Sequence, residues 1–222
     1  MNTSHPKENQ YSGPHQNQPL YLAGADPSVA KAAMIMVHGR GDSAQGILRL
    51  ANEIIHASKL LLLAPQAFGN TWYPYSFLKP THQNQPGLDS GLQAVNNAVQ
   101  NAVERGIPTD KIFILGFSQG ACLASEYVAR HARKYAGLMV LSGGLIGESI
   151  HPETYSGHLG GTSVFMGCSD VDFHIPVERV HESEKVLSLL GGRVTKNIYP
   201  GMGHTINQDE IDHINSMVSE IL

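Results

Sequence analysis

The amino-acid sequence alternates between short apolar runs and longer segments in which apolar residues recur at helical spacing. Most of the apolar runs lack the two-residue alternation of a half-exposed strand, so we expect strands that are buried on both faces. The expected strands are residues 33–37, 59–64, 111–116, 137–141, 163–167 and 193–199. The expected helices are residues 45–58, 87–106, 121–130, 177–190 and 208–222. Buried strands separated by helices predict an α/β fold, a mostly parallel sheet with helices on both faces.

The length of 222 residues suits one domain. Residues 1–18 are polar and contain proline and glycine, which predicts a flexible leader before a single domain at residues 19–222. Residues 19–24 are expected to add a short strand at the edge of the sheet. The loop at residues 65–86 is long for a compact domain and holds the only tryptophan, Trp72. We therefore regard it as a candidate functional segment.

The composition excludes several classes of function. The net charge is −4 and no stripe of lysine or arginine stands out, so we expect no nucleic-acid binding. The longest apolar run, residues 60–64, is too short for insertion across a membrane, and the N-terminus does not resemble a signal peptide. The two cysteines are expected to be free thiols, which favours a cytoplasmic protein. No histidine or cysteine cluster has metal-ligand spacing, so we expect no metal and no cofactor.

Residues 116–120, Gly-Phe-Ser-Gln-Gly, match the pattern G-x-S-x-G. An expected buried strand precedes this motif and a helix of small residues follows it, which is the strand–turn–helix that a nucleophile elbow requires. The two glycines leave room around the tight turn at Ser118, and the N-terminal amides of the helix point to where negative charge develops in acyl transfer. The simpler alternative is an ordinary turn between a strand and a helix.

A serine nucleophile needs an imidazole base and a carboxylate that orients the base. Among the twelve histidines, His204 is the best candidate because it follows the last expected strand and precedes the last helix. His15 falls in the predicted leader. The acid belongs between the serine and the base in the chain, after an earlier strand, where Asp170 and Asp172 are both available. Spacing alone does not separate these two carboxylates.

An oxyanion hole needs two N–H donors, and we assign them to the backbone of Gln119 and of Arg40. The Arg40 side chain has two open interpretations, contact with an anionic substrate group or an ion pair with Asp42. Apolar residues near these loops are candidates for the substrate pocket, with packing of the loop onto the sheet as the alternative for each. They are Trp72, Tyr73, Phe77, Leu78, Phe117, Ile175 and Met202.

Four segments together resemble the phospholipase/carboxylesterase family of α/β-hydrolases, which includes bacterial carboxylesterases, acyl-protein thioesterases and lysophospholipases. They are His-Gly-Arg-Gly-Asp at 38–42, the Ser118 motif, Asp-Phe-His-Ile-Pro at 172–176 and Gly-Met-Gly-His at 201–204. The resemblance extends from about Met34 to the C-terminus. It implies the α/β-hydrolase fold and a Ser118–His204 pair. In this family the acid stands four residues before a proline, which implies Asp172.

The sequence departs from the thioesterase branch at Arg40, where that branch usually has leucine. Residues 69–74 and 84–86 resemble a bacterial branch close to dienelactone-hydrolase-like enzymes, although dienelactone hydrolase uses cysteine where this chain has Ser118. We expect a serine carboxylesterase that hydrolyses short-to-medium acyl esters of small molecules through an acyl-enzyme intermediate. Residues 142–163 contain no apolar helix, so we expect no large lid domain.

Two groups of alternatives stay open at this stage. A thioesterase, a lysophospholipase or a lactone hydrolase would use the same triad. A non-catalytic binding protein on a hydrolase fold is the alternative from a different class. The oligomeric state is also open, and a homodimer is among the expectations.

Overall fold

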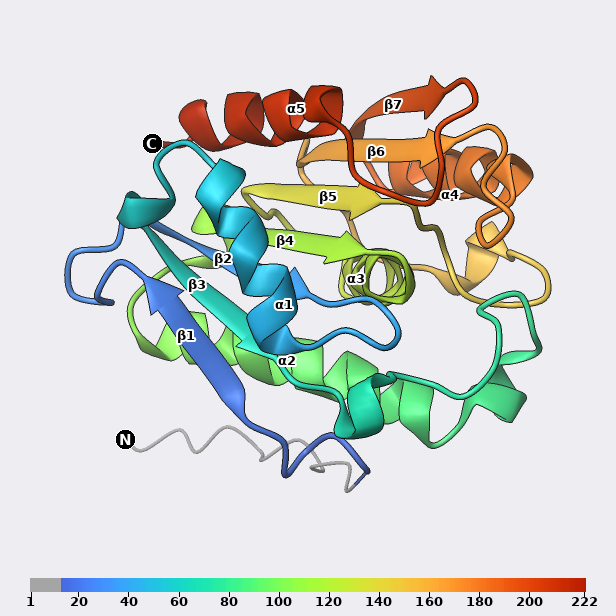
Figure 1. The fold of residues 1–222 in the computed structure, drawn as a ribbon, viewed down its shortest axis with the longest axis horizontal. Helices are drawn as coiled ribbons and strands as arrows, with labels where there is room; N and C mark the ends of the chain where they lie inside the picture. Colours follow the sequence, from blue (N-terminus) through green and yellow to red (C-terminus); the bar gives the residue numbers. More distant parts are fainter. Residues whose placement is uncertain (1–12) are drawn as a thin grey trace.

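The computed structural model describes residues 13–222 and contains a seven-stranded sheet in the order β1-β3-β2-β4-β5-β6-β7 (Figure 1). Only β1 runs antiparallel to its neighbour, at the edge beside β3. The other neighbouring strands pair in parallel. The strands are β1 Leu20–Gly24, β2 Ala32–Val37, β3 Leu60–Pro65, β4 Ile112–Phe117, β5 Gly137–Leu141, β6 Ser163–Ser169 and β7 Arg193–Tyr199. The mostly parallel sheet and the edge strand at residues 19–24 are confirmed.

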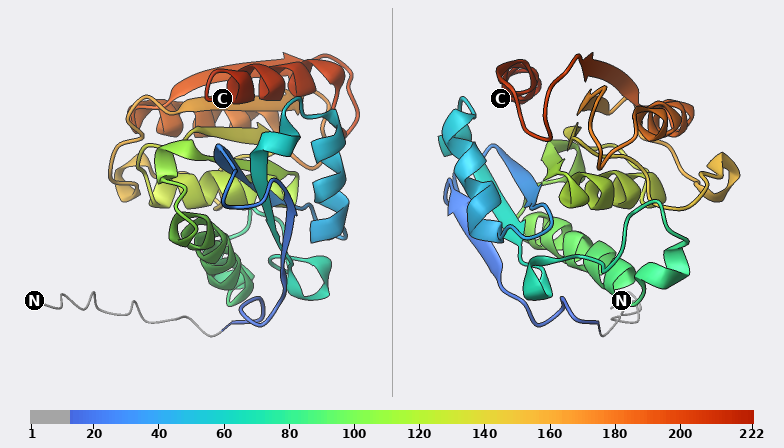
Figure 2. Two further views of the ribbon diagram at one scale, coloured as in Figure 1. Left: turned by 90° about the vertical axis from the view of Figure 1, so that its left-hand side faces the viewer. Right: turned by 45° about the vertical axis from the view of Figure 1, so that its right-hand side comes forward.

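Helices cover both faces of this sheet (Figure 2). The helices are α1 Ala44–Leu48, α2 Gly87–Glu104, α3 Gln119–Arg130, α4 Val177–Leu189 and α5 Gln208–Ser219. Helices α2, α3 and α4 share one hydrophobic core with the sheet, and α1 and α5 share a second core on the opposite face. Alternate residues of β2 enter the two cores, Ile35 the first and Met34 the second, and all six residues of the strand are buried. This explains why the strand sequences show no polar alternation.

The helix expected at residues 45–58 is much shorter in the structure. Helix α1 ends at Leu48, a 3-10 segment follows, and the backbone is already extended at Ile54. The side chain of Asn215 accepts a hydrogen bond from the Ile55 amide at 2.7 Å and donates to the Glu53 carbonyl at 3.2 Å. These contacts replace the partners that a longer helix would supply, so the expectation was wrong beyond the first turn.

The predicted flexible leader lies partly outside the described residues, since residues 1–12 are not among them. For residues 13–18 the prediction is wrong, because this short segment is folded against the domain. His15 is only 4% exposed, and its backbone amide donates to Ser90 Oγ at 2.9 Å. The Gln16 side chain donates to the Ser90 carbonyl. The polar residues that suggested a loose leader therefore serve as hydrogen-bonding groups that attach it.

Two further features of residues 13–222 bear on the fold. No helix in this range is both long enough and apolar enough to cross a bilayer. The connection between β5 and β6 contains only a single short helical turn, Pro152–Thr154, so the structure has no large lid domain. The fold is that of a single-domain α/β-hydrolase, as expected.

Candidate active site

Ser118 occupies the turn between β4 and α3, at the carboxyl edge of the sheet where β4, β5, β6 and β7 all point (right-hand side of Figure 1). Its backbone has φ +54° and ψ −122°, a conformation that L-residues rarely adopt. Two hydrogen bonds hold the turn: the Ser118 amide donates to the Leu141 carbonyl at 2.9 Å, and the Cys122 amide donates to the Ser118 carbonyl at 3.0 Å. The result is a strained turn that presents the hydroxyl at the top of the sheet.

The glycines on either side of Ser118 allow β4, α3 and β2 to approach closely. A Cβ atom on Gly116 would lie 2.3 Å from the Gly120 carbonyl oxygen, and one on Gly120 would lie 2.2 Å from the Val37 carbonyl oxygen. Both distances are far below contact range, so any larger residue would force the backbones apart. The turn chemistry expected from the sequence motif is present.

The imidazole of His204 lies between Ser118 and Asp172. Its Nε2 is 2.8 Å from Ser118 Oγ, and its Nδ1 is 2.6 Å from Asp172 Oδ2. Because a carboxylate only accepts, Nδ1 carries the proton and donates it to Asp172, which leaves Nε2 to accept from the serine hydroxyl. Phe117 and His174 flank the ring, with centroid distances of 5.1 and 4.9 Å. Three residues far apart in the sequence thus form one hydrogen-bonded chain.

The structure separates the two candidate acids. Asp172 is buried, and its Oδ1 accepts from the amides of His174 at 2.9 Å and Ile175 at 3.1 Å. Burial alone would raise the pKa of Asp172, but the hydrogen bonds from His204 and from these two amides outweigh it and hold the pKa below its ordinary value. Asp170 instead accepts from the Gly201 amide at 2.8 Å. It is Asp172 that contacts His204, while Asp170 supports the loop that carries the histidine.

The two expected oxyanion donors come from loops that lie against Ser118. Gln119 is the first residue of α3, where amides have no carbonyl partner within the helix. The loop after β2 passes so close that a Cβ atom on Gly39 would be 3.4 Å from Ser118 Cβ. The Arg40 amide donates to no carbonyl within residues 13–222. Both amides are therefore available, and their role as donors stays a prediction.

The Arg40 side chain binds backbone carbonyls rather than Asp42. Its terminal nitrogens donate to the carbonyls of Tyr73 at 2.9 Å, Pro74 at 3.0 Å and Tyr75 at 2.9 Å. An ion pair with Asp42 is therefore wrong, whereas contact with a substrate anion stays a prediction, because these three hydrogen bonds leave two of the five guanidinium N–H groups available. Arg40 attaches the long loop at residues 65–86 to the loop after β2.

The side chain of Gln119 has a second task that the sequence analysis missed. Its Oε1 accepts from the Trp72 amide at 3.0 Å, and its Nε2 donates to the Tyr73 carbonyl at 2.8 Å.

His38, at the end of β2, is fully buried. It donates from Nδ1 to the Gly39 carbonyl and accepts at Nε2 from the Ala67 amide. Burial lowers the pKa of His38, which agrees with a neutral ring. No local sequence signal distinguished these polar groups.

A cavity of about 310 Å³ opens over Ser118 and His204. Four of the seven predicted pocket residues line it, namely Tyr73, Phe77, Phe117 and Ile175. The prediction is wrong for the other three. Trp72 is fully buried and donates from Nε1 to the His38 carbonyl, Leu78 packs against the core, and Met202 Sδ accepts from the Asn207 amide group.

The cavity also has lining residues that the sequence analysis did not select. The pocket-lining residues missed are Gly39, Asp42, Ser76, Cys122 and His174. For two of them the sequence spacing could have predicted a place near the site. Cys122 follows the nucleophile by one helical turn, and His174 follows the acid by two residues. The wall thus combines apolar side chains such as Phe77 and Ile175 with polar ones such as Asp42 and His174.

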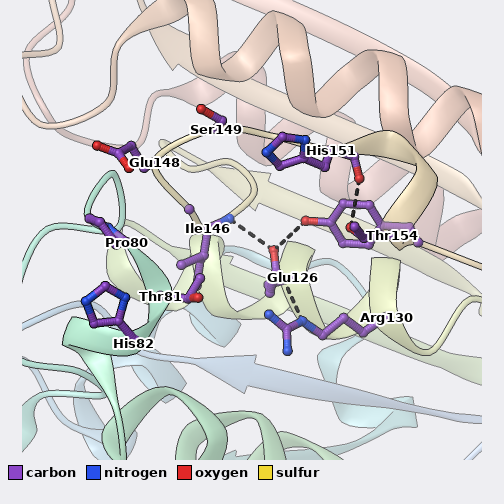
Figure 3. A pocket seen from close by; sticks show the side chains of 12 residues that line it. Pro80, Thr81, His82, Glu126, Arg130, Ile146, Glu148, Ser149, His151 and Thr154 are labelled. Carbon is purple, nitrogen blue, oxygen red and sulfur yellow. Dashed lines mark hydrogen bonds and ion pairs between the residues drawn. The ribbon is translucent and has the colours of Figure 1, made fainter.

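A larger cavity of about 540 Å³ lies away from these residues, between Pro80–His82, the second half of α3 and the loop at residues 146–155 (Figure 3). At its base the carboxylate of Glu126, which is 1% exposed, binds Arg130 Nε at 2.6 Å, the Ile146 amide at 3.0 Å and the Tyr155 hydroxyl at 3.1 Å. This carboxylate is already engaged on both oxygens. The larger cavity lacks a nucleophile next to a base, so the smaller one is the candidate active site.

Comparison with known proteins identifies the family of this chain. Residues 24–222 match the family model described as phospholipase/carboxylesterase. The chain belongs to the phospholipase/carboxylesterase family. It is therefore a hydrolase of the carboxylesterase and thioesterase type with the α/β-hydrolase fold. The family resemblance inferred from the four sequence motifs is confirmed.

Individual relatives agree with the family match. A phospholipase/carboxylesterase from Dyadobacter fermentans has a solved structure that superimposes with a TM-score of 0.88 at 41% identity, over 91% of this chain and 97% of that chain. Acyl-protein thioesterase 1 of Debaryomyces hansenii is 26% identical over 92% of this chain and 97% of its own length. Lysophospholipase-like protein 1 of Mus musculus is 24% identical over 84% of this chain and 85% of its own length. The relatives thus include proteins named for different ester and thioester substrates.

Proposed function

We propose that this protein is a serine carboxylesterase that hydrolyses short-to-medium acyl esters of small molecules through an acyl-enzyme intermediate. The observation that carries the proposal is the hydrogen-bonded chain from the Ser118 hydroxyl through the His204 ring to the buried Asp172 carboxylate. The strained backbone of Ser118 presents its hydroxyl toward the cavity, and His204 Nε2 lies where it can accept the hydroxyl proton.

In the first half of the reaction, Ser118 Oγ attacks the ester carbonyl carbon while its proton passes to His204 Nε2. The imidazolium that forms is stabilised by Asp172 through the Nδ1 hydrogen bond at 2.6 Å. The tetrahedral intermediate then collapses, His204 returns the proton to the departing alcohol oxygen, and the acyl group remains on Ser118 as an ester. In the second half, His204 takes a proton from water while the resulting hydroxide adds to the acyl carbon. On collapse, His204 returns that proton to Ser118 Oγ, and the acid is released.

The oxyanion that forms in each half needs donors that are fixed before the reaction begins. The Gln119 amide, at the start of α3, and the Arg40 amide, in the loop after β2, belong to two segments that meet beside Ser118. The side chains of the same two residues attach both segments to residues 72–75. Gln119 and Arg40 would therefore donate from their backbones and fix the position of those backbones through their side chains.

The dimensions of the cavity support an acyl group of limited length. Its volume of about 310 Å³ is at the lower end of the range for small-molecule sites, and Phe77, Phe117 and Ile175 give it apolar walls. Long acyl chains would have to leave the cavity or displace Phe77. A small substrate with a short or medium acyl chain fits without such a change.

The experiment is a profile of hydrolysis across p-nitrophenyl esters of increasing acyl length, with the Ser118→Ala protein as blank. We expect turnover of acetyl to hexanoyl esters to exceed that of dodecanoyl and longer esters, and Ser118→Ala to abolish turnover while its thermal unfolding stays cooperative. A fluorophosphonate probe should label the wild-type protein and not Ser118→Ala. Turnover by Ser118→Ala comparable with wild type would overturn the proposal.

A thioester is a second candidate substrate, because the thioesterase relative spans nearly the whole chain. The same nucleophile would attack a thioester carbonyl, so the triad does not discriminate between the two. Matched acetyl and octanoyl oxygen esters and thioesters with the same acyl group decide between them through the ratio of their kcat/KM values. We expect the oxygen ester to be preferred at short acyl length.

A further inference from the structure

We propose that His15, outside the catalytic cavity, is a positioning residue for the oxyanion hole. It would act through the backbone and ring of Trp72, which contact both loops expected to supply the oxyanion donors. The inference rests on the proposed esterase function for its kinetic consequences. Its structural part concerns only how the N-terminal segment attaches the loop at residues 65–86.

His15 contacts that loop with both nitrogens of its ring. Nε2 lies 2.9 Å from the Trp72 carbonyl oxygen, and Nδ1 lies 3.0 Å from the Phe68 amide. A carbonyl only accepts and an amide only donates, so Nε2 carries the proton and Nδ1 is the acceptor. Only a neutral imidazole in this one tautomer makes both hydrogen bonds. Burial lowers the pKa of His15, against the opposing effect of its hydrogen bond to the Trp72 carbonyl, and so favours the neutral ring.

The backbone around His15 is attached independently of the ring. The His15 amide donates to Ser90 Oγ at 2.9 Å, and Ser90 Oγ donates to Gln16 Oε1 at 2.8 Å. Ser90 is a fully buried residue of α2, which packs on the sheet. The imidazole is thus fixed to the rigid core on one side, and it holds Phe68 and Trp72 of the loop on the other.

Trp72 contacts the supports of both expected oxyanion donors. Its backbone amide donates to the Gln119 side chain, whose own amide is the first expected donor. Its indole Nε1 donates to the His38 carbonyl at 2.8 Å, two residues before Arg40, the second expected donor. The indole lies between two imidazoles, 5.3 Å from the His15 ring and 4.9 Å from the His38 ring. A displacement of Trp72 therefore shifts the supports of both donors together.

The catalytic rate depends on the position of an oxyanion donor to within less than the length of a hydrogen bond. When supporting residues allow a catalytic group to move by about 1 Å, the rate falls by roughly 10²-fold. Because the oxyanion exists only after attack on the carbonyl, loosening its donors lowers kcat and leaves substrate binding largely unchanged. A loss confined to overall stability would not produce this pattern.

The test compares His15→Phe with His15→Gln. Phenylalanine keeps a ring beside Trp72 but loses both hydrogen bonds, whereas glutamine keeps an N–H donor group and a carbonyl acceptor on a side chain of similar length. We expect His15→Phe to lower kcat for p-nitrophenyl butyrate by roughly tenfold to 100-fold with KM within about twofold. His15→Gln should recover most of that loss. His151→Phe, which changes an exposed histidine, serves as the matched control.

Intrinsic fluorescence gives a second readout that needs no catalytic activity, because Trp72 is the only tryptophan. We expect the Trp72 emission maximum to move to longer wavelength in His15→Phe, as the loop loosens, and to stay unchanged in His151→Phe. If wild type shows no esterase activity, the proposed function fails while the emission shift still tests the attachment. Where His15→Phe does not fold, Ser90→Ala, which removes the anchor of the segment, is measured in the same way.

The proposal is overturned by a His15→Phe protein that keeps kcat within about twofold of wild type. It is equally overturned if His15→Gln and His15→Phe lose the same activity, since the hydrogen bonds would then not be the cause. An unchanged Trp72 emission in a folded His15→Phe protein would show that the loop does not depend on the histidine.

Discussion

Replacing Asp172 with asparagine isolates one feature of the triad, the tautomer of His204. Asparagine is nearly isosteric, and its Oδ1 can still accept the amides of His174 and Ile175 that now bind Asp172. The carboxamide NH2 would then occupy the position of Oδ2, 2.6 Å from His204 Nδ1. Because that group donates, Nδ1 must become the acceptor and the ring proton moves to Nε2. Nε2 can no longer take the proton of Ser118.

The expected magnitude follows from this change of tautomer. A triad whose base is held in the wrong tautomer loses about 10⁴-fold in kcat, which corresponds to about 5.4 kcal/mol of transition-state stabilisation. The loss should appear in kcat, with little change in KM, because the ground-state complex does not use the His204 proton. The two retained amide contacts predict that thermal unfolding changes only by a few degrees.

Asp170→Asn provides the matched control, two residues away in the same loop. Asp170 accepts one hydrogen bond from the Gly201 amide, and asparagine can accept it as well. We expect kcat within about threefold of wild type for this variant, measured beside Asp172→Asn with one p-nitrophenyl ester between pH 6 and pH 9. If Asp172→Asn keeps a tenth of the wild-type kcat, or if Asp170→Asn loses as much as Asp172→Asn, the assignment of the acid is refuted.

Three other substitutions test the surroundings of the site. Arg40→Met removes three hydrogen bonds to carbonyls and should cost about 1–2 kcal/mol of stability, a few degrees in Tm; an unchanged Tm contradicts this. Burial raises the pKa of Glu210 to about 7, so this carboxyl alone contributes about 2–3 kcal/mol of stability at pH 5 that is lost by pH 8, while the lowered pKa values of His15 and His38 act in the opposite direction. Urea unfolding should therefore show the stability of wild type relative to Glu210→Gln falling by about 2–3 kcal/mol between pH 5 and pH 8. Phe77→Ala should shift the preferred ester toward longer acyl chains, whereas Phe68→Ala, which truncates an exposed side chain of the same loop, should leave the acyl profile unchanged.

The sequence predicted the nucleophile and the base because each depends on local chemistry at the end of a buried strand. The motif at residues 116–120 carries its own geometric requirement, and His204 has a fixed place between β7 and α5. The acid is a different case. Asp170 and Asp172 follow the same strand, and only the family resemblance favoured Asp172. In the structure, backbone amides at residues 174 and 175 turn one carboxylate inward, an arrangement that spacing does not encode.

The length of the loop at residues 65–86 marks it as a candidate functional segment, but the sequence does not predict the orientation of its side chains. Trp72 and Tyr73 are adjacent and both apolar, yet the first is a buried support and the second lines the cavity. In a strand or helix, periodicity would assign the two faces. An irregular loop has no such period, so its orientation depends on tertiary contacts such as those from Arg40 and Gln119.

Polar composition also misled the prediction for the N-terminal segment. A polar stretch is expected to remain in solvent because it buries too little apolar surface to offset its ordering. Residues 13–18 are instead ordered by hydrogen bonds to groups that are themselves buried, above all the Ser90 hydroxyl and the Trp72 carbonyl. Those groups would be left without partners if the segment detached, and an unsatisfied buried polar group is costly. The segment is therefore held partly because its detachment would leave polar groups of the domain without hydrogen-bond partners. The composition of the segment does not reveal this contribution.

The variable position after the serine of G-x-S-x-G has a structural role in this chain. The glycines are fixed by close approach, and the serine by its chemistry, whereas the motif leaves position 119 open. In this chain the residue at that position contributes an amide beside the nucleophile and a side chain that holds Trp72 and Tyr73. Trp72 is in turn held by His15, so the residue after the nucleophile connects the reacting centre to the N-terminal segment. On the proposed role of His15, the positions of the oxyanion donors depend on contacts between residues more than a hundred positions apart, whereas the motif covers only residues 116–120.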